Sequence, residues 1–482
     1  MRLHLLAAVT ALALALTACV SGGGLHPDGT SIDPASLQSG HSLAGVQLSA
    51  AAWPSADWWQ GLDDPQLDAL MREALRDNPG LGLADARARA AQAAAGSADA
   101  ARGPDVTASA GMPGARLPGT VLPGGHFKLA KYGYVSFAWG LDLWGGKRAA
   151  WQAALGTARV AQIEARAARI ELSGNVARAY AELGYAFRQQ DLGKAELDRA
   201  KTSRELTRQR VAAGIDNRIQ LRRSDIEVDT ATQRLAQATR AIDAARSSLA
   251  VLLGKGPDRG LDVARPRLLR PRALAVPTDL PVDLLGHRAD LVAARWRVEA
   301  SRQDIKAAKA AFMPNVSIGA LAGVIALGGG NPLSLPARFY QAGPSISLPL
   351  FDGGRLRAQL SYRDAQYDIA VAQYNQTLVG ALNQVADEVS ALQSLHEQIA
   401  AQRRAQDAAA DAWHMAQQRY RAGIGNYLES LDVRRQLLAA EQTMAVLQAR
   451  QVDLSVQLIE ALGGGFQPQA GTAAPSPTPT RS

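Results

Sequence analysis

The sequence predicts a membrane protein of mixed α+β class, internally duplicated, in which long coiled-coil helices are combined with a few membrane-spanning strands. Three observations support this prediction. The two halves of the chain repeat each other, each half contains a helix longer than an ordinary domain needs, and each half contains two segments with strand periodicity. The 482 residues are 47% hydrophobic but only 5% aromatic. Ala and Leu carry most of the apolar content, which favours helix.

The duplication is visible as matches at a nearly constant spacing. LGLADARARA from Leu81 matches LVAARWRVEA from Leu291, and RVAAGIDN from Arg210 matches RYRAGIGN from Arg419. Matches at one spacing indicate a duplicated unit rather than chance similarity. The expected organisation is a signal peptide at 1–18, a lipidated tether at 19–62, repeats at 63–254 and 280–465, a linker at 255–279 and a disordered tail at 466–482.

Each repeat is expected to contain the same helices in the same order. An Ala-rich helix stops before a proline, and a very long helix and a return helix follow the strands. The expected ranges are 81–102, 147–211 and 218–253 in the first repeat and 291–312, 356–421 and 427–462 in the second. At about 1.5 Å per residue, the long helices would extend about 100 Å.

The long helix of the second repeat carries the pattern of a coiled coil. Its apolar residues recur every seven positions, at Val371, Leu378, Val385, Leu392 and Ile399. A self-contained helical bundle would also explain this pattern. It would not explain the strand segments at matching points of both repeats.

The strand segments alternate apolar with small or polar residues, which is the period of a strand with one apolar face. In the first repeat Val135, Phe137, Trp139, Leu141 and Leu143 alternate in this way, and in the second Val316 and Ile318 and then Ile346, Leu348 and Leu350 do so. A membrane-spanning strand needs only about 9 to 11 residues. After the N-terminal segment, no apolar run reaches the roughly 18 residues of a spanning helix.

Two strands per repeat are too few to close a barrel. An open sheet edge would leave N–H and C=O groups unpaired in lipid, at several kcal/mol each. The barrel must therefore be shared between chains. A barrel of about eight strands is filled by its own side chains, whereas a trimer would leave room for a lumen.

An aromatic residue followed by glycines stands between the last strand and the long helix of both repeats. The turns comprise Trp144, Gly145 and Gly146, and Phe351, Gly353 and Gly354. Glycine reaches backbone angles that suit a sharp change of direction, and the aromatic residues are expected at the membrane interface. The alternative is a plain helix N-cap, for which Asp352 is well placed and Asp142 less so.

The N-terminus reads as a secretory signal. An apolar run from Leu3 to Leu16 follows the basic Arg2 and is too short to cross a bilayer of about 30 Å. It ends in LTAC, whose Cys19 is the single cysteine of the chain. This motif resembles a bacterial lipoprotein signal, and the resemblance implies lipidation of Cys19 and sorting to the outer membrane. The alternative is an ordinary signal peptide with an incidental cysteine.

Charge and motifs argue against nucleic-acid binding and catalysis. The net charge of +8 arises from 52 basic and 44 acidic residues that are scattered, without the basic face and stacking aromatics of a nucleic-acid site. The seven His residues occur singly, and no paired-carboxylate, phosphate-loop or metal-spacing motif is present. We therefore expect no enzyme activity, no cofactor and no metal.

Five stretches together resemble the TolC-like outer-membrane efflux factors, in particular their lipidated branch. They are WPSADWWQGLDDPQLDALMREALRDNPGL from 53, LPVDLLGHRADLVAA from 280, AAFMPNVSIGA from 310, LPLFDGGRLRAQL from 348 and RYRAGIGNYLESLDVRRQLL from 419. The resemblance covers residues 53–466. One departure, GHRAD at 286–290, places only local loop geometry in doubt.

The resemblance implies a homotrimer with a twelve-stranded β-barrel in the outer membrane and a twelve-helix α-barrel in the periplasm. It further implies a passive exit duct for drugs or other small molecules. The implied partners are a periplasmic adaptor and an inner-membrane RND-type pump. The alternatives are an exit for type I polypeptide secretion and a lipid-anchored periplasmic coiled-coil structural protein.

By the same resemblance, the two helix turns at 214–225 and 423–432 form the periplasmic tip, and the aperture acids of the family fall on Glu429 and Asp432. These residues share a helix face, and a ring of them would attract cations. Asn426 and Glu429 also fit a capping box, as Asn217 and Gln220 do. The arginines expected to hold the tip closed, through ion pairs of about 0 to 1 kcal/mol each, are Arg218, Arg222 and Arg223.

Overall fold

The computed structural model describes residues 23–37, 53–116, 127–267, 269, 280–425 and 427–467. By internal contacts the chain divides into two units. The sheet unit comprises Met1–Ser31, Arg87–Gln162 and Ala293–Asn375, and the hairpin unit comprises Ile32–Ala86, Ile163–Val292 and Gln376–Ser482. The predicted signal peptide, Cys19, Asn426 and residues 468–482 lie outside the described residues.

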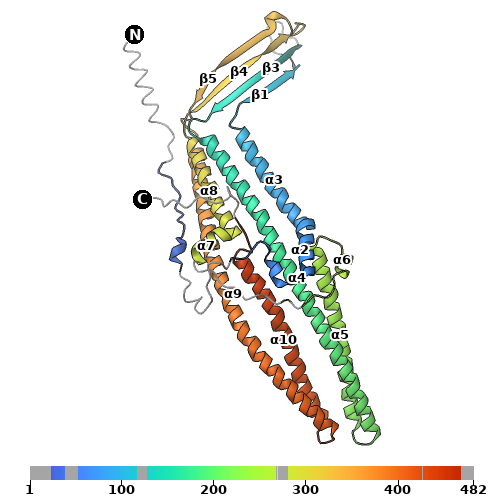
Figure 1. Ribbon diagram of the computed structural model, residues 1–482. Coiled ribbons are helices and arrows are strands. Elements are labelled where there is room, and N and C mark those ends of the chain that lie inside the picture. The colour runs from blue at the N-terminus through green and yellow to red at the C-terminus, as the bar shows by residue number, and fades with distance from the viewer. Residues whose placement is uncertain are drawn as a thin grey trace. The chain divides into compact units, whose positions relative to one another are not determined.

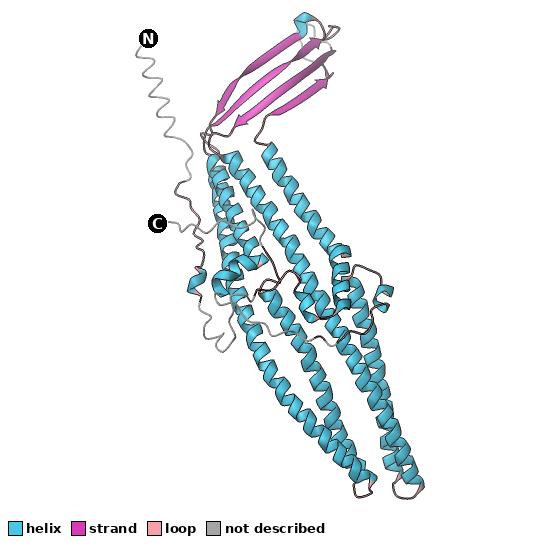
Figure 2. Ribbon diagram, in the orientation of Figure 1, coloured by secondary structure: helices cyan, strands magenta, loops and turns pink. Residues whose placement is uncertain are grey.

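The described elements follow the same order in both halves (Figures 1 and 2). The first half contains η1 (Pro34–Ser36), η2 (Trp58–Leu62), α2 (Pro65–Asp77), α3 (Pro79–Ala100), β1 (Asp105–Gly111), β2 (Gly114–Arg116), β3 (Phe127–Leu141), α4 (Gly146–Ala212), α5 (Arg218–Leu252) and α6 (Asp258–Leu261). The second contains α7 (Leu280–His287), α8 (Ala289–Ala310), β4 (Asn315–Leu327), η3 (Leu335–Ala337), β5 (Arg338–Ser347), α9 (Arg355–Arg421) and α10 (Tyr427–Ala461).

The duplication is confirmed by equal helix lengths. Helices α3 and α8 have 22 residues each, α4 and α9 have 67 each, and α5 and α10 have 35 each. In α9 the predicted seam residues Val371, Leu378 and Val385 are buried, and Leu392 and Ile399 are half-buried. The heptad pattern therefore marks the packed side of this helix.

The strands form one antiparallel sheet in the order β1-β3-β4-β5, with β2 paired to the far end of β3. In its register, Phe137 lies opposite Val106 of β1 and Ala320 of β4, and Trp139 lies opposite Ile318. Directly paired residues share a face of the sheet, so the predicted alternation is confirmed. One face carries Val106, Val135, Phe137, Trp139, Leu141, Val316, Ile318, Tyr340 and Ile346.

The strands end earlier than predicted. Strand β3 ends at Leu141 and β5 ends at Ser347, so Leu143, Leu348 and Leu350 lie beyond them. Pro349 lacks the N–H that would extend the ladder past β5. In the first half the chain turns toward α4 at this point.

The core of the hairpin unit lies around the buried Tyr180, Leu67 and Met71. Asp64 caps α2 by accepting a hydrogen bond from the Gln66 N–H at 2.9 Å, and Pro65 is the first helical residue. Asp64 also accepts a bond from the Tyr180 hydroxyl at 2.8 Å. This cap therefore joins two helices of the core.

Aromatic residues near both ends of the described chain are packed. Phe466, the first residue of the predicted tail, is 4% exposed, so the packed part of the chain reaches one residue into that tail. Trp58 and Trp59 are buried in the core of the hairpin unit. Large aromatic side chains gain most from burial.

None of the described helices combines the length and the apolar character needed to cross a membrane.

Candidate functional site

The strand-to-helix turns use glycine as predicted, with one exception. Gly145 has a φ of 72°, and Gly353 and Gly354 have φ values of 66° and 87°, in the region that favours glycine. Gly146 does not have a positive φ. It is required for space, because a Cβ there would lie 2.7 Å from the Cβ of Ala310.

Both turns are also helix caps. The Asp142 carboxylate accepts bonds from the N–H groups of Lys147 at 2.9 Å and Arg148 at 2.8 Å. The Asp352 carboxylate accepts bonds from Gly354 at 3.0 Å and Leu356 at 2.9 Å. The expectation that Asp142 is poorly placed was wrong, because the turn at Gly145 brings the start of α4 back over its carboxylate. Turn and cap are therefore combined in both repeats.

The aromatic residues of the turns remain exposed in the chain. Trp144 is 53% exposed and donates its indole N–H to the Pro314 carbonyl at 2.7 Å, while Phe351 is 89% exposed. An exposed aromatic residue at the end of an apolar sheet is typical of a membrane interface. That location stays a prediction for both residues.

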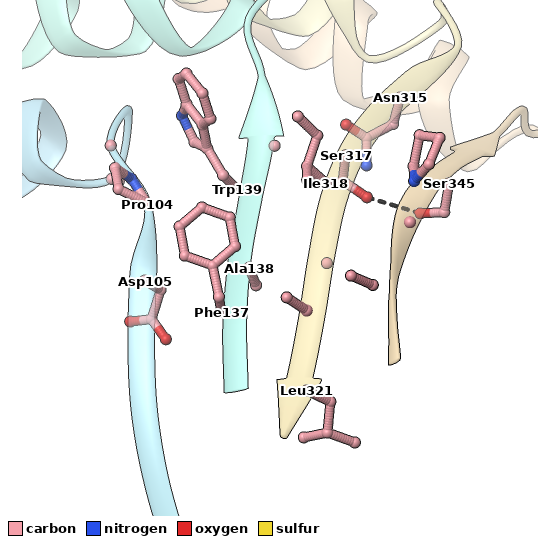
Figure 3. Close-up of a pocket in the computed structure, with 18 of the residues that line it drawn as sticks. Pro104, Asp105, Phe137, Ala138, Trp139, Asn315, Ser317, Ile318, Leu321 and Ser345 are labelled. Atoms are coloured by element: carbon pink, nitrogen blue, oxygen red, sulfur yellow. Dashed lines mark hydrogen bonds between the residues drawn. The ribbon is translucent and has the colours of Figure 1, made fainter. Parts of the chain in front are cut away.

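A hollow of about 970 Å³ lies beside the sheet near these turns (Figure 3). Residues of β1, β3, β4, β5 and the end of α3 line it. Ser317 and Ser345 are joined by a hydrogen bond of 2.8 Å across β4 and β5, and Lys147 donates to the Gly140 carbonyl at 2.9 Å. The described residues contain no group of three or more His, Cys, Asp or Glu side chains that could hold a metal ion.

At the end of the hairpin unit, the turn between α4 and α5 is held by polar contacts. Asn217 and Gln220 form the predicted capping box, with the Asn217 N–H bonded to Gln220 Oε1 at 2.6 Å. Arg210 and Asp216 form an ion pair at 2.8 Å, and the Arg210 guanidinium lies 4.8 Å from the ring centre of Tyr420 on α9. Burial raises the pKa of the Tyr420 hydroxyl, which lies 3.5 Å from Asp216. Sequence reasoning missed this cluster, although Asp216 replaces a glycine of the second repeat.

The predicted aperture acids are exposed on α10. The Glu429 carboxylate lies 4.0 Å from the Arg419 guanidinium, and Asp432 accepts a bond from the Gln436 amide at 2.9 Å. Arg222 instead pairs with Asp225 on its own helix at 3.2 Å. Within one chain, the structure describes an ion pair of Glu429 with Arg419, and the pairing of the tip through Arg218, Arg222 and Arg223 stays a prediction. The capping alternative for Glu429 involves Asn426, outside the described residues.

A second missed cluster is buried between α4, α9 and α10. The Arg434 guanidinium binds the Glu196 carboxylate through Nε at 3.1 Å and Nη2 at 3.0 Å, and both residues are less than 9% exposed. Arg199 also binds Glu196, and both guanidinium groups lie within 6 Å of the Trp413 ring. No spacing rule pairs residues so far apart in sequence.

An exposed apolar sheet, joined through capped glycine turns to two long coiled-coil hairpins, defines a class of outer-membrane channel. The family model described as "Outer membrane efflux protein" matches residues 70–255 and 280–464. The chain therefore belongs to the outer membrane efflux protein family. The two matched ranges also follow the internal duplication.

Characterised relatives span almost the whole chain. The "Probable efflux pump outer membrane protein TtgC" of Pseudomonas putida is 32% identical over 474 residues, which are 96% of this chain and 97% of that protein. The structure of the outer membrane protein VceC from Vibrio cholerae has 36% sequence identity and a TM-score of 0.79, and the match covers 86% of this chain and all of VceC. The outer-membrane channel OprN has 30% identity and a TM-score of 0.80, over 93% and 100% of the two chains. All three relatives are outer-membrane proteins, of which one is described as a probable efflux pump protein and one as a channel.

Proposed function

We propose that this chain forms the passive exit duct of a tripartite efflux system. In this proposal a homotrimer joins its sheets into a twelve-stranded barrel in the outer membrane. Drugs or other small molecules then leave the periplasm through the shared lumen. A periplasmic adaptor and an inner-membrane RND-type pump open the tip and supply the energy.

The observation that carries the proposal is the four-strand path of the sheet with two free ends. Strands β1 and β5 each have one partner in the described chain, namely β3 and β4. Their outer N–H and C=O groups need partners in lipid. Pairing β1 of one copy with β5 of the next satisfies both edges at once and closes the barrel.

The exposed apolar face supports the same arrangement. Val106, Val135 and Ile346 lie on one face and are 65%, 50% and 72% exposed. The other face carries the polar Thr107, Ser136 and Ser317, and Leu321 and Ile325 also lie on it. An apolar face toward lipid and a polar face toward a water-filled lumen is the arrangement of a channel-forming barrel.

At the tip, we infer that Glu429 and Asp432 line the aperture. Both are exposed on α10 near the turn, as an aperture residue must be. At the other end, we infer that lipidation of Cys19 fixes the chain to the outer membrane, because acyl chains contribute about 0.8 kcal/mol per buried methylene. A Cys19→Ser variant should lose lipid labelling in cells while it retains the apolar sheet.

The assembly is tested by measuring the mass of the purified protein in detergent and its conductance in planar bilayers. We expect a trimer that forms discrete channels. A stable monomer would overturn the shared barrel. Transport is tested by deleting the gene and measuring the accumulation of dyes and antibiotics in cells. Unchanged accumulation with loss of a secreted polypeptide would instead support the secretion alternative.

A further inference from the structure

The segment at residues 23–31, which we name the N-terminal strap, lies along one face of α9 in the sheet unit. It follows the predicted lipidation site but is not a loose tether. Gly23 lies beside the Arg357 guanidinium, and Leu25 packs against the apolar cluster of Ile305, Phe312, Leu356 and Leu360. Farther along, the Gly29 N–H donates to Asp368 at 2.7 Å, and Asn375 donates to the Thr30 carbonyl at 2.9 Å.

These contacts follow a regular stripe on the helix. Arg357, Leu360, Asp364, Asp368, Val371 and Asn375 are spaced by three or four residues. Residues so spaced lie on one helix face. Strap residues 26–28 connect the contact at Leu25 with the contact at Gly29, and His26 and Asp28 of this stretch act electrostatically on Asp364, which lies between the two contacts on the stripe.

Asp364 lies between the two contacts of the strap, and a carboxylate is unusual in such a buried position. It is 5% exposed, and both carboxyl oxygens are buried without a hydrogen-bond partner among the described residues. An ionised carboxylate in such a place pays a large desolvation cost, which the neutral acid avoids. The position is therefore compatible with a protonated side chain and poorly compatible with a charged one.

Charged groups of α9, of α8 and of the strap act on Asp364. Burial raises its pKa, and Asp368 of α9 and Asp28 of the strap raise it further. Lys309 of α8 and His26 of the strap act in the opposite direction. His26 also lies 3.5 Å from Asp28, which offsets part of its attraction for Asp364.

We propose that the N-terminal strap is a pH-responsive clasp that docks on α9 while Asp364 is protonated and is released as Asp364 ionises. The docked state binds the proton more tightly than the released state, in which solvent reaches the carboxyl group. Docking is therefore strongest below the ordinary carboxyl pKa of about 4 and weakens as the pH rises toward the raised pKa of the docked state. Each unit of difference between the two pKa values changes the ratio of docked to released strap about tenfold.

The proposal is tested with a nitroxide spin label on a Thr30→Cys variant of the full-length lipidated protein in lipid nanodiscs. Thr30 is exposed, so the label itself does not block docking. The immobile component of the spectrum should decrease as the pH rises above about 4. With Asp364→Asn, which is neutral at every pH, the label should stay immobile throughout. A spectrum of Thr30→Cys alone that does not change with pH would overturn the proposal. So would a pH titration that is the same with and without Asp364→Asn.

Two further variants separate this effect from general damage. Asp304→Asn changes a carboxylate of α8 that is paired with Arg363 at 3.3 Å, and it should leave the titration unchanged. Lys309→Gln removes a cation that favours ionised Asp364, so it should move the transition to higher pH at low ionic strength. If Asp364→Asn does not fold, an unshifted transition in Lys309→Gln would contradict the proposal.

Discussion

At the scale of single residues, the polar contacts near the ends of the hairpins join elements that are distant in sequence. Tyr420 of α9 packs on the Arg210 guanidinium, and Arg210 in turn pairs with Asp216 in the turn after α4. Deeper in the unit, Arg434 of α10 binds Glu196 of α4. The two halves of the duplicated chain are thereby fixed to one another by buried charge as well as by apolar packing.

The buried pair Arg434–Glu196 should be costly to break. We expect Arg434→Ala to lower the free energy of unfolding by about 3 kcal/mol, the lower end for such pairs because Arg199 remains beside Glu196. Urea unfolding followed by circular dichroism measures the change. Arg435→Ala, whose ion pair with Glu227 is exposed on the arginine side, is the control and should cost about 1 kcal/mol or less. Equal losses would refute the role of burial.

The proposed aperture depends on the charge of Asp432. If this residue lines the opening, Asp432→Ala should raise single-channel conductance and weaken cation preference in planar bilayers, because it removes carboxylates from a narrow passage. Gln436→Ala removes the hydrogen-bond partner of Asp432 and keeps the charge, so cation preference should persist. Unaltered conductance and selectivity in Asp432→Ala would exclude Asp432 from the aperture.

At the scale of elements, the strand-to-helix turn has a fixed design. A capping aspartate, an exposed aromatic residue and a glycine with positive φ occur in both repeats, although the spacing differs slightly: Asp142 precedes Trp144, whereas Phe351 precedes Asp352. The same structural result is thus reached with two orders of residues. This explains why the sequence alone identified Asp352 as a cap and underestimated Asp142.

The turn of the second repeat offers a matched pair of glycine substitutions. Gly353 has a positive φ and open space around its Cβ position, so Gly353→Ala should cost about 1 to 2 kcal/mol through backbone strain alone. Gly380 lies inside α9, also with open space, and Gly380→Ala should stabilise the chain by about 0.5 to 1 kcal/mol. Thermal unfolding of both variants separates the effect of backbone strain from the effect of adding a Cβ, because both positions have open space and only Gly353 has a positive φ. A loss of stability in both would argue for contacts between chains at Gly380.

The cap at Asp142 is tested in the same way. Asp142→Ala should destabilise the protein by about 0.5 to 2 kcal/mol, because the N–H groups of Lys147 and Arg148 lose their acceptor. Asp142→Asn should recover only part of the loss, since its one amide oxygen can replace only one of the two carboxylate oxygens that accept from Lys147 and Arg148. Thermal unfolding of the two variants, measured side by side, provides the comparison. A variant Asp142→Asn as stable as the unchanged chain would show that the second carboxylate oxygen contributes nothing to the cap.

At the scale of the whole molecule, the sequence predicted the periodic features well. The order of elements, the heptad seam through Val371 and the alternation along β3 all follow from short-range patterns. The ends of the strands, the pairings of Arg210 and Glu196 and the burial of Asp364 did not follow. These features depend on contacts between elements that are distant in the sequence, and short-range sequence patterns do not predict such contacts. The packing of the N-terminal strap was missed for the same reason, since a Gly-rich segment after a signal reads as flexible.

The equal lengths of the duplicated helices carry a consequence for how such a chain can change. The two 67-residue helices have the same length between the glycine turn at their start and the turn at their end. The two 35-residue helices that follow these turns also have equal lengths. Deleting seven residues from one of these helices would make its hairpin differ in length from the hairpin of the other repeat. Deleting seven residues from all four helices would shorten both hairpins equally. Functional length variants should therefore carry insertions or deletions of equal size at equivalent positions of both repeats.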